Sequence, residues 1–215
     1  MVLFGGTFDP VHNGHVAIAE AAAQTFSPDK MIVLPAGNPY QRAGLPFASG
    51  SDRVAMLVAG MGLTSTKVVI DRRELNRTGP TYTVDTLQEL RKELGDEMPL
   101  IWLIGSDAFS RLDTWHRWQD LFELAHFAVV VRPGEKPLET TLGTDLATAI
   151  QHRAATAPEL NRQPAGSIVS LALTPPKISS TQIRERCQNG ESLRGLVPAA
   201  VCDYIEHHKL YVNRP

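Results

Sequence analysis

Short apolar runs alternate with longer amphipathic stretches along the whole chain. The runs are rich in Val, Ile and Leu, which is typical of strands buried on both faces of a sheet. The amphipathic stretches repeat their apolar residues with the period of a helix that covers a sheet. We therefore predict strands over residues 2–4, 31–34, 67–71, 100–104, 127–131 and 168–173, and helices over residues 15–26, 51–61, 82–94, 144–155, 179–188 and 198–208.

This alternating order of strands and helices also predicts the fold class. Strands that alternate with helices form a parallel sheet with right-handed crossovers. We expect an α/β protein with a Rossmann-like, doubly wound parallel sheet and helices on both faces. No internal repeat and no break in composition interrupts the 215 residues. The prediction is therefore a single domain over residues 1–215, which includes a C-terminal helical part over about 176–211.

Composition and charge narrow the range of partners. The formal net charge is −2, which argues against a large nucleic-acid-binding surface. No apolar run has the length that a membrane span needs, and the first residues do not resemble a secretory signal peptide. The two cysteines, Cys187 and Cys202, are sparse and form no C-x-x-C pair. We expect a cytoplasmic protein with reduced thiols and with no nucleic-acid or membrane partner.

The first predicted strand runs into a motif suited to phosphate. Residues 5–15 read Gly-Gly-Thr-Phe-Asp-Pro-Val-His-Asn-Gly-His and lead into a predicted helix. Ligands of doubly wound sheets bind at the carboxyl ends of strands, where glycines allow close approach and helix N-termini attract anions. His12 and His15 add imidazole N–H donors, and protonation would strengthen their contact with phosphate. The spacing matches neither G-x-G-x-x-G nor a P-loop, and metal ligation by the two histidines is the alternative interpretation.

A second candidate phosphate-binding segment follows the last predicted strand. Residues 178–184 read Ile-Ser-Ser-Thr-Gln-Ile-Arg. The hydroxyl residues suit the start of a helix, where they cap free N–H groups or leave them to a phosphate. Arg184 lies one turn further on, and its planar guanidinium suits phosphate oxygens. An ordinary N-cap would also explain the hydroxyls, so the functional interpretation depends on the first motif.

Two further segments carry groups for an aromatic, anionic substrate. Residues 80–87 read Pro-Thr-Tyr-Thr-Val-Asp-Thr-Leu, while Gly-Ser-Asp at 105–107 is followed by Thr-Trp-His at 114–116. An indole face attracts an electron-poor ring, and hydroxyl and backbone N–H groups suit a carboxylate. The structural alternatives are packing for Trp115, helix anchoring for Tyr82 and N-capping for Asp107.

The first motif resembles the signature of the nucleotidyltransferase superfamily with an H-x-G-H phosphate-binding motif. From about residue 3 to residue 211, the chain resembles the bacterial nicotinate-nucleotide adenylyltransferases. The resemblance implies an enzyme of NAD biosynthesis that joins ATP and nicotinate mononucleotide to give deamido-NAD and pyrophosphate, with Mg²⁺ accompanying ATP. Three alternatives stay open: another phosphorylated acceptor such as nicotinamide mononucleotide, a nucleotide-sensing module without turnover, and an RNA-binding relative of synthetase cores.

The resemblance further implies a role for individual residues and no metal held by side chains. In that family the positions of Trp115 and Thr83 hold the pyridine ring and its carboxylate. Expected catalytic residues are His12, His15 and Arg184. The expected ATP-binding residues are Gly5, Gly6, Thr7, Phe8, His12, His15, Ile178, Ser179, Thr181 and Arg184. The expected mononucleotide-binding residues are Arg42, Tyr82, Thr83, Asp107, Trp115 and His116.

The segment after the second predicted strand departs from the family pattern. The family usually shows P-P-H-[KR] there, whereas this chain has Pro-Tyr-Gln-Arg over residues 39–42. Arg42 keeps the basic end, but Gln41 replaces the usual histidine. A glutamine side chain can donate a hydrogen bond but cannot carry charge.

Overall fold

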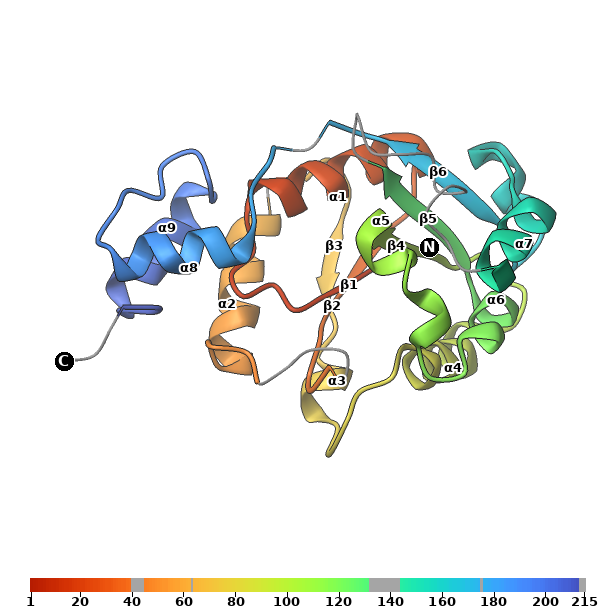
Figure 1. Cartoon of the computed structure of the whole chain (residues 1–215), viewed down its shortest axis with the longest axis horizontal. Coiled ribbons are helices and arrows are strands. Elements are labelled where there is room, and N and C mark those ends of the chain that lie inside the picture. The colour runs from red at the N-terminus through yellow and green to blue at the C-terminus, as the bar shows by residue number, and fades with distance from the viewer. Residues whose placement is uncertain (40–44, 63, 132–143, 175, 213–215) are drawn as a thin grey trace.

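Six parallel strands form one sheet at the centre of the computed structural model, and helices cover both faces (Figure 1). The structure describes residues 1–39, 45–62, 64–131, 144–174 and 176–212. The strands lie in the order β3-β2-β1-β4-β5-β6, which confirms the predicted Rossmann-like α/β fold. They are β1 (Val2–Gly6), β2 (Met31–Pro35), β3 (Val68–Ile70), β4 (Ile101–Gly105), β5 (His126–Val131) and β6 (Ile168–Ala172).

The predicted helices form close to their expected bounds. They are α1 (Asn13–Phe26), α2 (Gly50–Met61), α4 (Thr83–Leu94), α7 (Thr144–Arg153), α8 (Ser180–Gln188) and α9 (Ala199–His207). Helix α1 starts two residues before the predicted position, and α2 is capped by Ser49, whose Oγ accepts the Asp52 backbone N–H at 3.1 Å. The structure adds short turns: α3 (Arg73–Asn76), α5 (Ser106–Phe109), α6 (Leu121–Leu124), η1 (Leu112–Thr114), η2 (Trp118–Asp120) and η4 (Ala157–Arg162).

Two apolar layers hold the sheet between its helices. Alternate residues of a strand point to opposite faces. In β1, Val2 and Phe4 pack in one layer, with residues of α1, α2, α8 and α9. Leu3 packs in the other layer, with residues of α4, α5, α6 and α7. Because both faces of the central strands are covered, β1, β2 and β4 are apolar along their length, whereas the edge strands β3 and β6 have exposed positions such as Val69 and Ser170.

The C-terminal helices lie at one end of the molecule, next to α2 (Figure 1). Ile183 of α8 and Val201 of α9 are fully buried in the same apolar layer as α1 and α2. The Tyr204 hydroxyl of α9 donates to Asp52 Oδ1 of α2 at 3.0 Å. The chain's last helices therefore pack against α2, the helix that follows β2. Within the described residues, no helix is both long enough and apolar enough to cross a membrane.

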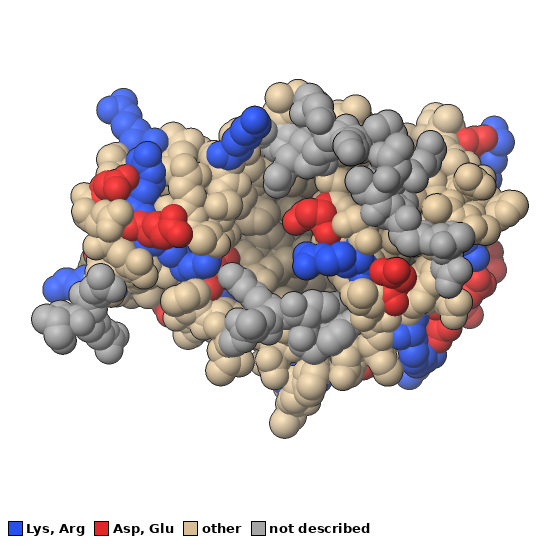
Figure 2. Space-filling model, viewed as in Figure 1, with Lys and Arg blue, Asp and Glu red and all other residues tan. Residues whose placement is uncertain are grey.

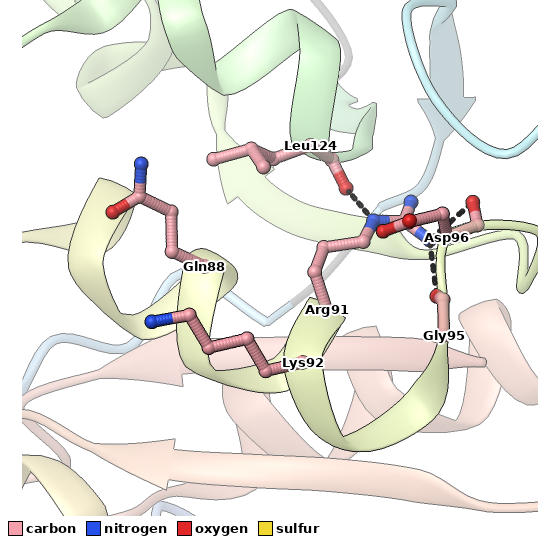
Figure 3. Close-up of a pocket in the computed structure, with 6 residues that line it drawn as sticks. All are labelled: Gln88, Arg91, Lys92, Gly95, Asp96 and Leu124. Carbon is pink, nitrogen blue, oxygen red and sulfur yellow. Dashed lines mark hydrogen bonds between the residues drawn. The ribbon is translucent and has the colours of Figure 1, made fainter.

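A pocket beside the C-terminal end of α4 surrounds Arg91, which stabilises the fold (Figure 3). Arg91 is 6% exposed, and its guanidinium points into the turn that follows the helix, whereas Lys92 points away. The guanidinium donates to five backbone carbonyls, at distances of 2.6–3.3 Å, from Leu124, Gly95, Asp96, Met98 and Pro164. Arg91 therefore joins three separate segments at the edge of the sheet opposite to the carboxyl ends of its strands.

Candidate active site

A cleft of about 660 Å³ opens where β1 and β4 end. In the order β3-β2-β1-β4-β5-β6 the crossovers reverse direction between β1 and β4, and such a switch point is where doubly wound sheets bind ligands. Figure 2 shows the molecule hollowed near the centre of this face, with both basic and acidic side chains at the rim. Six of the predicted site residues line the cleft: Gly5, Gly6, Thr7, Thr83, Asp107 and Trp115.

The glycine at the end of β1 leaves room for an aromatic ring. A Cβ atom on Gly5 would lie 2.4 Å from the Trp102 ring, so no other residue fits without moving that ring. Trp102 is 4% exposed and belongs to the apolar layer, as the sequence predicts. Its ring also forms part of the cleft wall. The strand end therefore combines bare backbone with an aromatic surface.

The two histidines meet at the start of α1. His12 is the N-cap residue, and its ring stacks on that of His15 with centroids 3.7 Å apart. The His12 backbone N–H donates to His15 Nδ1 at 3.3 Å. A Cβ atom on Gly14 would lie 3.0 Å from the His12 ring, so the glycine between the histidines permits their stacking. The H-x-G-H spacing is thus a local packing requirement as well as a source of donors.

His15 is a neutral donor in the free protein. Removal from water, and secondarily the nearby His12, hold the pKa of His15 well below its ordinary value of 6.5. Because Nδ1 accepts a hydrogen bond, the ring proton belongs on Nε2. Before ligands bind, His15 therefore lacks the positive charge that would strengthen its contact with phosphate. Phe8, whose ring centroid lies 5.0 Å from that of His15, contributes to this apolar surrounding.

Two segments from opposite ends of the chain meet at this turn. Ser180 Oγ, in the first turn of α8, donates to the Pro10 carbonyl at 3.0 Å. Arg184 Nη1 donates to the Asp9 carbonyl at 2.7 Å. The starts of α1 and α8 therefore lie at the same turn. Two positive helix-dipole ends in one place favour an anion.

Arg184 is held on several sides. Its side chain is buried, Nη2 donates to Thr181 Oγ1 at 3.1 Å, and the Phe47 ring covers the guanidinium at 4.6 Å. Ser179 accepts the Gln182 backbone N–H at 3.1 Å, so it serves as the ordinary N-cap of α8. The side chains of Phe8 and Ile178 pack in the apolar layer, which leaves their backbone atoms to contribute to a ligand site.

Three of the residues predicted for the second substrate line the cleft, whereas His12, His15 and Arg184 are not among the residues described as lining it. Thr83 begins α4, Asp107 lies in α5, and Trp115 follows η1. Tyr82 and His116 are sequence neighbours of these lining residues, and their rings contact each other with centroids 4.4 Å apart. The described lining does not include those two rings. Arg42 and Gln41 lie outside the described residues.

Sequence reasoning missed two charged residues of the cleft wall. Glu74 is buried and accepts the Thr86 hydroxyl at 2.8 Å, and burial raises the pKa of its carboxyl. Arg111 is exposed and its Nε lies 3.3 Å from the Asp107 carbonyl, four residues before it. Neither residue has a signal in the sequence, because Arg111 contacts a backbone carbonyl rather than the Asp107 carboxylate and Glu74 lies outside the motifs described above. The described part of the chain has no group of three or more His, Cys, Asp or Glu side chains that could hold a metal ion.

Known proteins are similar to this chain in sequence and in fold. Residues 3–186 match the model of the cytidylyltransferase-like family. A probable nicotinate-nucleotide adenylyltransferase of Laribacter hongkongensis is 47% identical over 214 residues, covering 97% of this chain and 93% of that protein. The corresponding protein of Herminiimonas arsenicoxydans is 40% identical over 211 residues, covering 98% and 96%.

Solved structures agree on the architecture. The nicotinic acid mononucleotide adenylyltransferase of Plasmodium falciparum, complexed with NaAD, superimposes with a TM-score of 0.70 at 17% identity. The match covers 98% of this chain and 96% of that chain, and at this identity it speaks for the fold alone. On the sequence matches, the chain belongs to the cytidylyltransferase-like family and is a member of the nicotinate-nucleotide adenylyltransferases.

Proposed function

We propose that this chain transfers the AMP part of ATP to nicotinate mononucleotide, giving nicotinate adenine dinucleotide and pyrophosphate. The observation that carries the proposal is the meeting of the α1 and α8 N-termini beside an aromatic-walled cleft. The first feature suits a triphosphate, and the second suits a flat ring with a carboxylate. Full-length relatives named for this activity support the same conclusion.

The reaction needs no nucleophilic side chain. A 5′-phosphate oxygen of the mononucleotide attacks the α-phosphorus of ATP, and the bond from that phosphorus to the bridging oxygen of the β-phosphate breaks. The attacking oxygen is already anionic, so no general base has to remove a proton. Catalysis then consists of holding the two phosphates in line and stabilising the charge that moves onto pyrophosphate.

The site residues divide this work. His15 would donate its Nε2 proton to a phosphate oxygen without first becoming charged, which agrees with its depressed pKa. Arg184 would supply a permanent positive charge from a fixed position, because a guanidinium stays protonated. The N–H groups of α1 and α8 would cradle the remaining oxygens.

The divalent cation is proposed to arrive with ATP. Mg²⁺ usually keeps several waters and is bound through substrate phosphates with few protein ligands. Among the described residues, no group of three or more His, Cys, Asp or Glu side chains could hold the ion by itself, so we propose that the phosphates of ATP supply its main ligands. When bound, the ion would offset the charge of the triphosphate.

The choice of acceptor is tested by comparing substrates. Pyrophosphate release with ATP and Mg²⁺ should show the highest kcat/KM for nicotinate mononucleotide, with lower values for nicotinamide mononucleotide and phosphopantetheine. A higher value for the amide would contradict the proposed acceptor. Failure to release pyrophosphate with any acceptor would instead favour a nucleotide-sensing module.

Trp115 offers a prediction for the acceptor side of the cleft. Trp115→Ala should raise KM for the mononucleotide by about 10-fold, because a cation over an indole face gains about 0.5–2 kcal/mol. KM for ATP should change by less than about 2-fold, since Trp115 lies on the wall that carries Thr83. Steady-state kinetics with each substrate varied in turn checks this.

The matched control is Trp118, which packs edge-on against Phe122 with centroids 6.2 Å apart and is not among the residues described as lining the cleft. Trp118→Ala should leave both KM values nearly unchanged. Equal effects of the two substitutions would mean that Trp115 only packs.

A further inference from the structure

Asp9 connects the phosphate-binding turn to two distant parts of the chain. It is fully buried, and its carboxylate accepts three hydrogen bonds. Oδ2 accepts the Phe47 backbone N–H at 2.8 Å, while Oδ1 accepts the Ala48 backbone N–H at 3.1 Å and the Tyr211 hydroxyl at 2.9 Å. Its carbonyl accepts Arg184 Nη1 at 2.7 Å. One residue thus holds the segment before α2, the C-terminal turn and the guanidinium.

The position of the Phe47 ring is explained by its contact with Arg184. Its side chain is 69% exposed, so apolar packing does not hold it. Its ring nevertheless lies over the Arg184 guanidinium at 4.6 Å, a cation–π contact. The backbone of the same residue is fixed by Asp9. The Asp9 carboxylate therefore sets the position of the ring that covers the guanidinium.

Tyr211 completes the arrangement from the end of the chain. It packs against the apolar layer that contains α8 and α9, and its φ of 63° lies in the left-handed region that disfavours a side chain. The hydrogen bond to Asp9 offsets part of that cost. Burial, and the charge of Asp9, raise the pKa of Tyr211, so its hydroxyl remains a donor at any working pH.

We propose that Tyr211 is a positioning residue for the triphosphate site. Its hydroxyl orients the Asp9 carboxylate, the carboxylate holds residues 47–48, and Phe47 then keeps the Arg184 guanidinium aimed at the phosphates. Tyr211 touches no substrate in this scheme. The inference rests on the proposed function for the part that Arg184 plays.

The chain supplies a matched control for this inference. Tyr204, in α9, donates to Asp52 Oδ1 at 3.0 Å, which is the same chemistry between the C-terminal part and an earlier segment. Tyr211→Phe should lower kcat/KM for ATP by about 10-fold while KM for the mononucleotide stays within about 2-fold. Tyr204→Phe should leave both nearly unchanged, although each variant lowers the melting temperature. Equal kinetics for the two variants would overturn the proposal.

Phe47 tests whether the effect of Tyr211 passes through the ring over Arg184, and because this ring is 69% exposed we expect its replacement to cost little stability. Phe47→Leu should reproduce the loss in kcat/KM for ATP, and Phe47→Tyr, which keeps an aromatic face, should restore it. Combining Tyr211→Phe with Phe47→Leu should cost little more than the larger single loss, because both act on Arg184. Multiplying losses would show independent action and would contradict the inference.

The positioning role of Tyr211 can also be tested by nucleotide binding, without measuring activity. If the wild-type chain released no pyrophosphate with any acceptor, the proposed function would fail on its own. The four variants would then be compared by their dissociation constants for α,β-methylene-ATP with Mg²⁺. Weaker binding by Tyr211→Phe and Phe47→Leu alone would still support the positioning role, and equal binding by all four would overturn it.

Discussion

Replacing His15 with alanine should lower kcat by about 10²–10³, the usual loss when one preorganised donor to a developing negative charge is removed. The His15 ring is fixed by stacking on His12 and by the hydrogen bond to Nδ1, so its orientation is set before substrates bind. KM for ATP should change much less, because the α1 and α8 N-termini remain. Steady-state kinetics on the pure variant checks this, and near-normal turnover would contradict the role.

A second substitution at His15 tests the protonation state of its ring. His15→Gln keeps a neutral N–H donor and should recover about 10-fold of the activity lost in the alanine variant. A pKa well below 6.5 leaves the imidazole neutral throughout the range from about pH 6.5 to 8. The ratio of wild-type to His15→Gln kcat/KM for ATP should therefore stay constant over that range. A ratio that grows as the pH falls would mean that the wild-type enzyme uses a protonated ring.

Replacing Arg91 should give a large loss of stability while leaving the active site unchanged. Arg91→Leu should lower the free energy of unfolding by about 3 kcal/mol, because it leaves several backbone carbonyls without their donor at a buried position. For a chain of this length that corresponds to a fall in melting temperature of about 6–12 °C. Urea or thermal denaturation measures the loss.

The neighbouring Lys92 provides the control for Arg91. Its side chain is exposed and points away from the turn in Figure 3. Lys92→Leu should change the unfolding free energy by less than about 0.5 kcal/mol. Both variants should keep wild-type KM values. If Arg91→Leu were as stable as Lys92→Leu, the five carbonyl contacts would not contribute to the fold.

The fold could be predicted from the sequence because its strongest signals are local. Strands covered on both faces require continuous apolar runs, and those runs locate β1, β2, β4 and β5 within a residue or two. The single-turn helices α3, α5 and α6 gave no such signal, because four residues make only about one helical turn and cannot show a repeat of apolar positions. The strand order was not predicted, because local patterns do not report which strands pair.

The candidate site could be predicted only where its residues lie close together in the sequence. His12 and His15 lie within one motif, and the hydroxyls with Arg184 lie within another. The contact of Asp9 with Tyr211 joins residues 202 positions apart, and no periodicity reports such a pair. The neutral state of His15 was also beyond the pattern, because it depends on how much water the folded chain removes from the ring.

A structure of the chain with α,β-methylene-ATP and Mg²⁺ tests whether the two helix N-termini share one triphosphate. The triphosphate should bridge the starts of α1 and α8, with phosphate oxygens within hydrogen-bond distance of His15 Nε2 and the Arg184 guanidinium. The α-phosphate should face the cleft that Thr83 and Trp115 line. A triphosphate bound at only one of the two helices, or on another face of the sheet, would contradict the account.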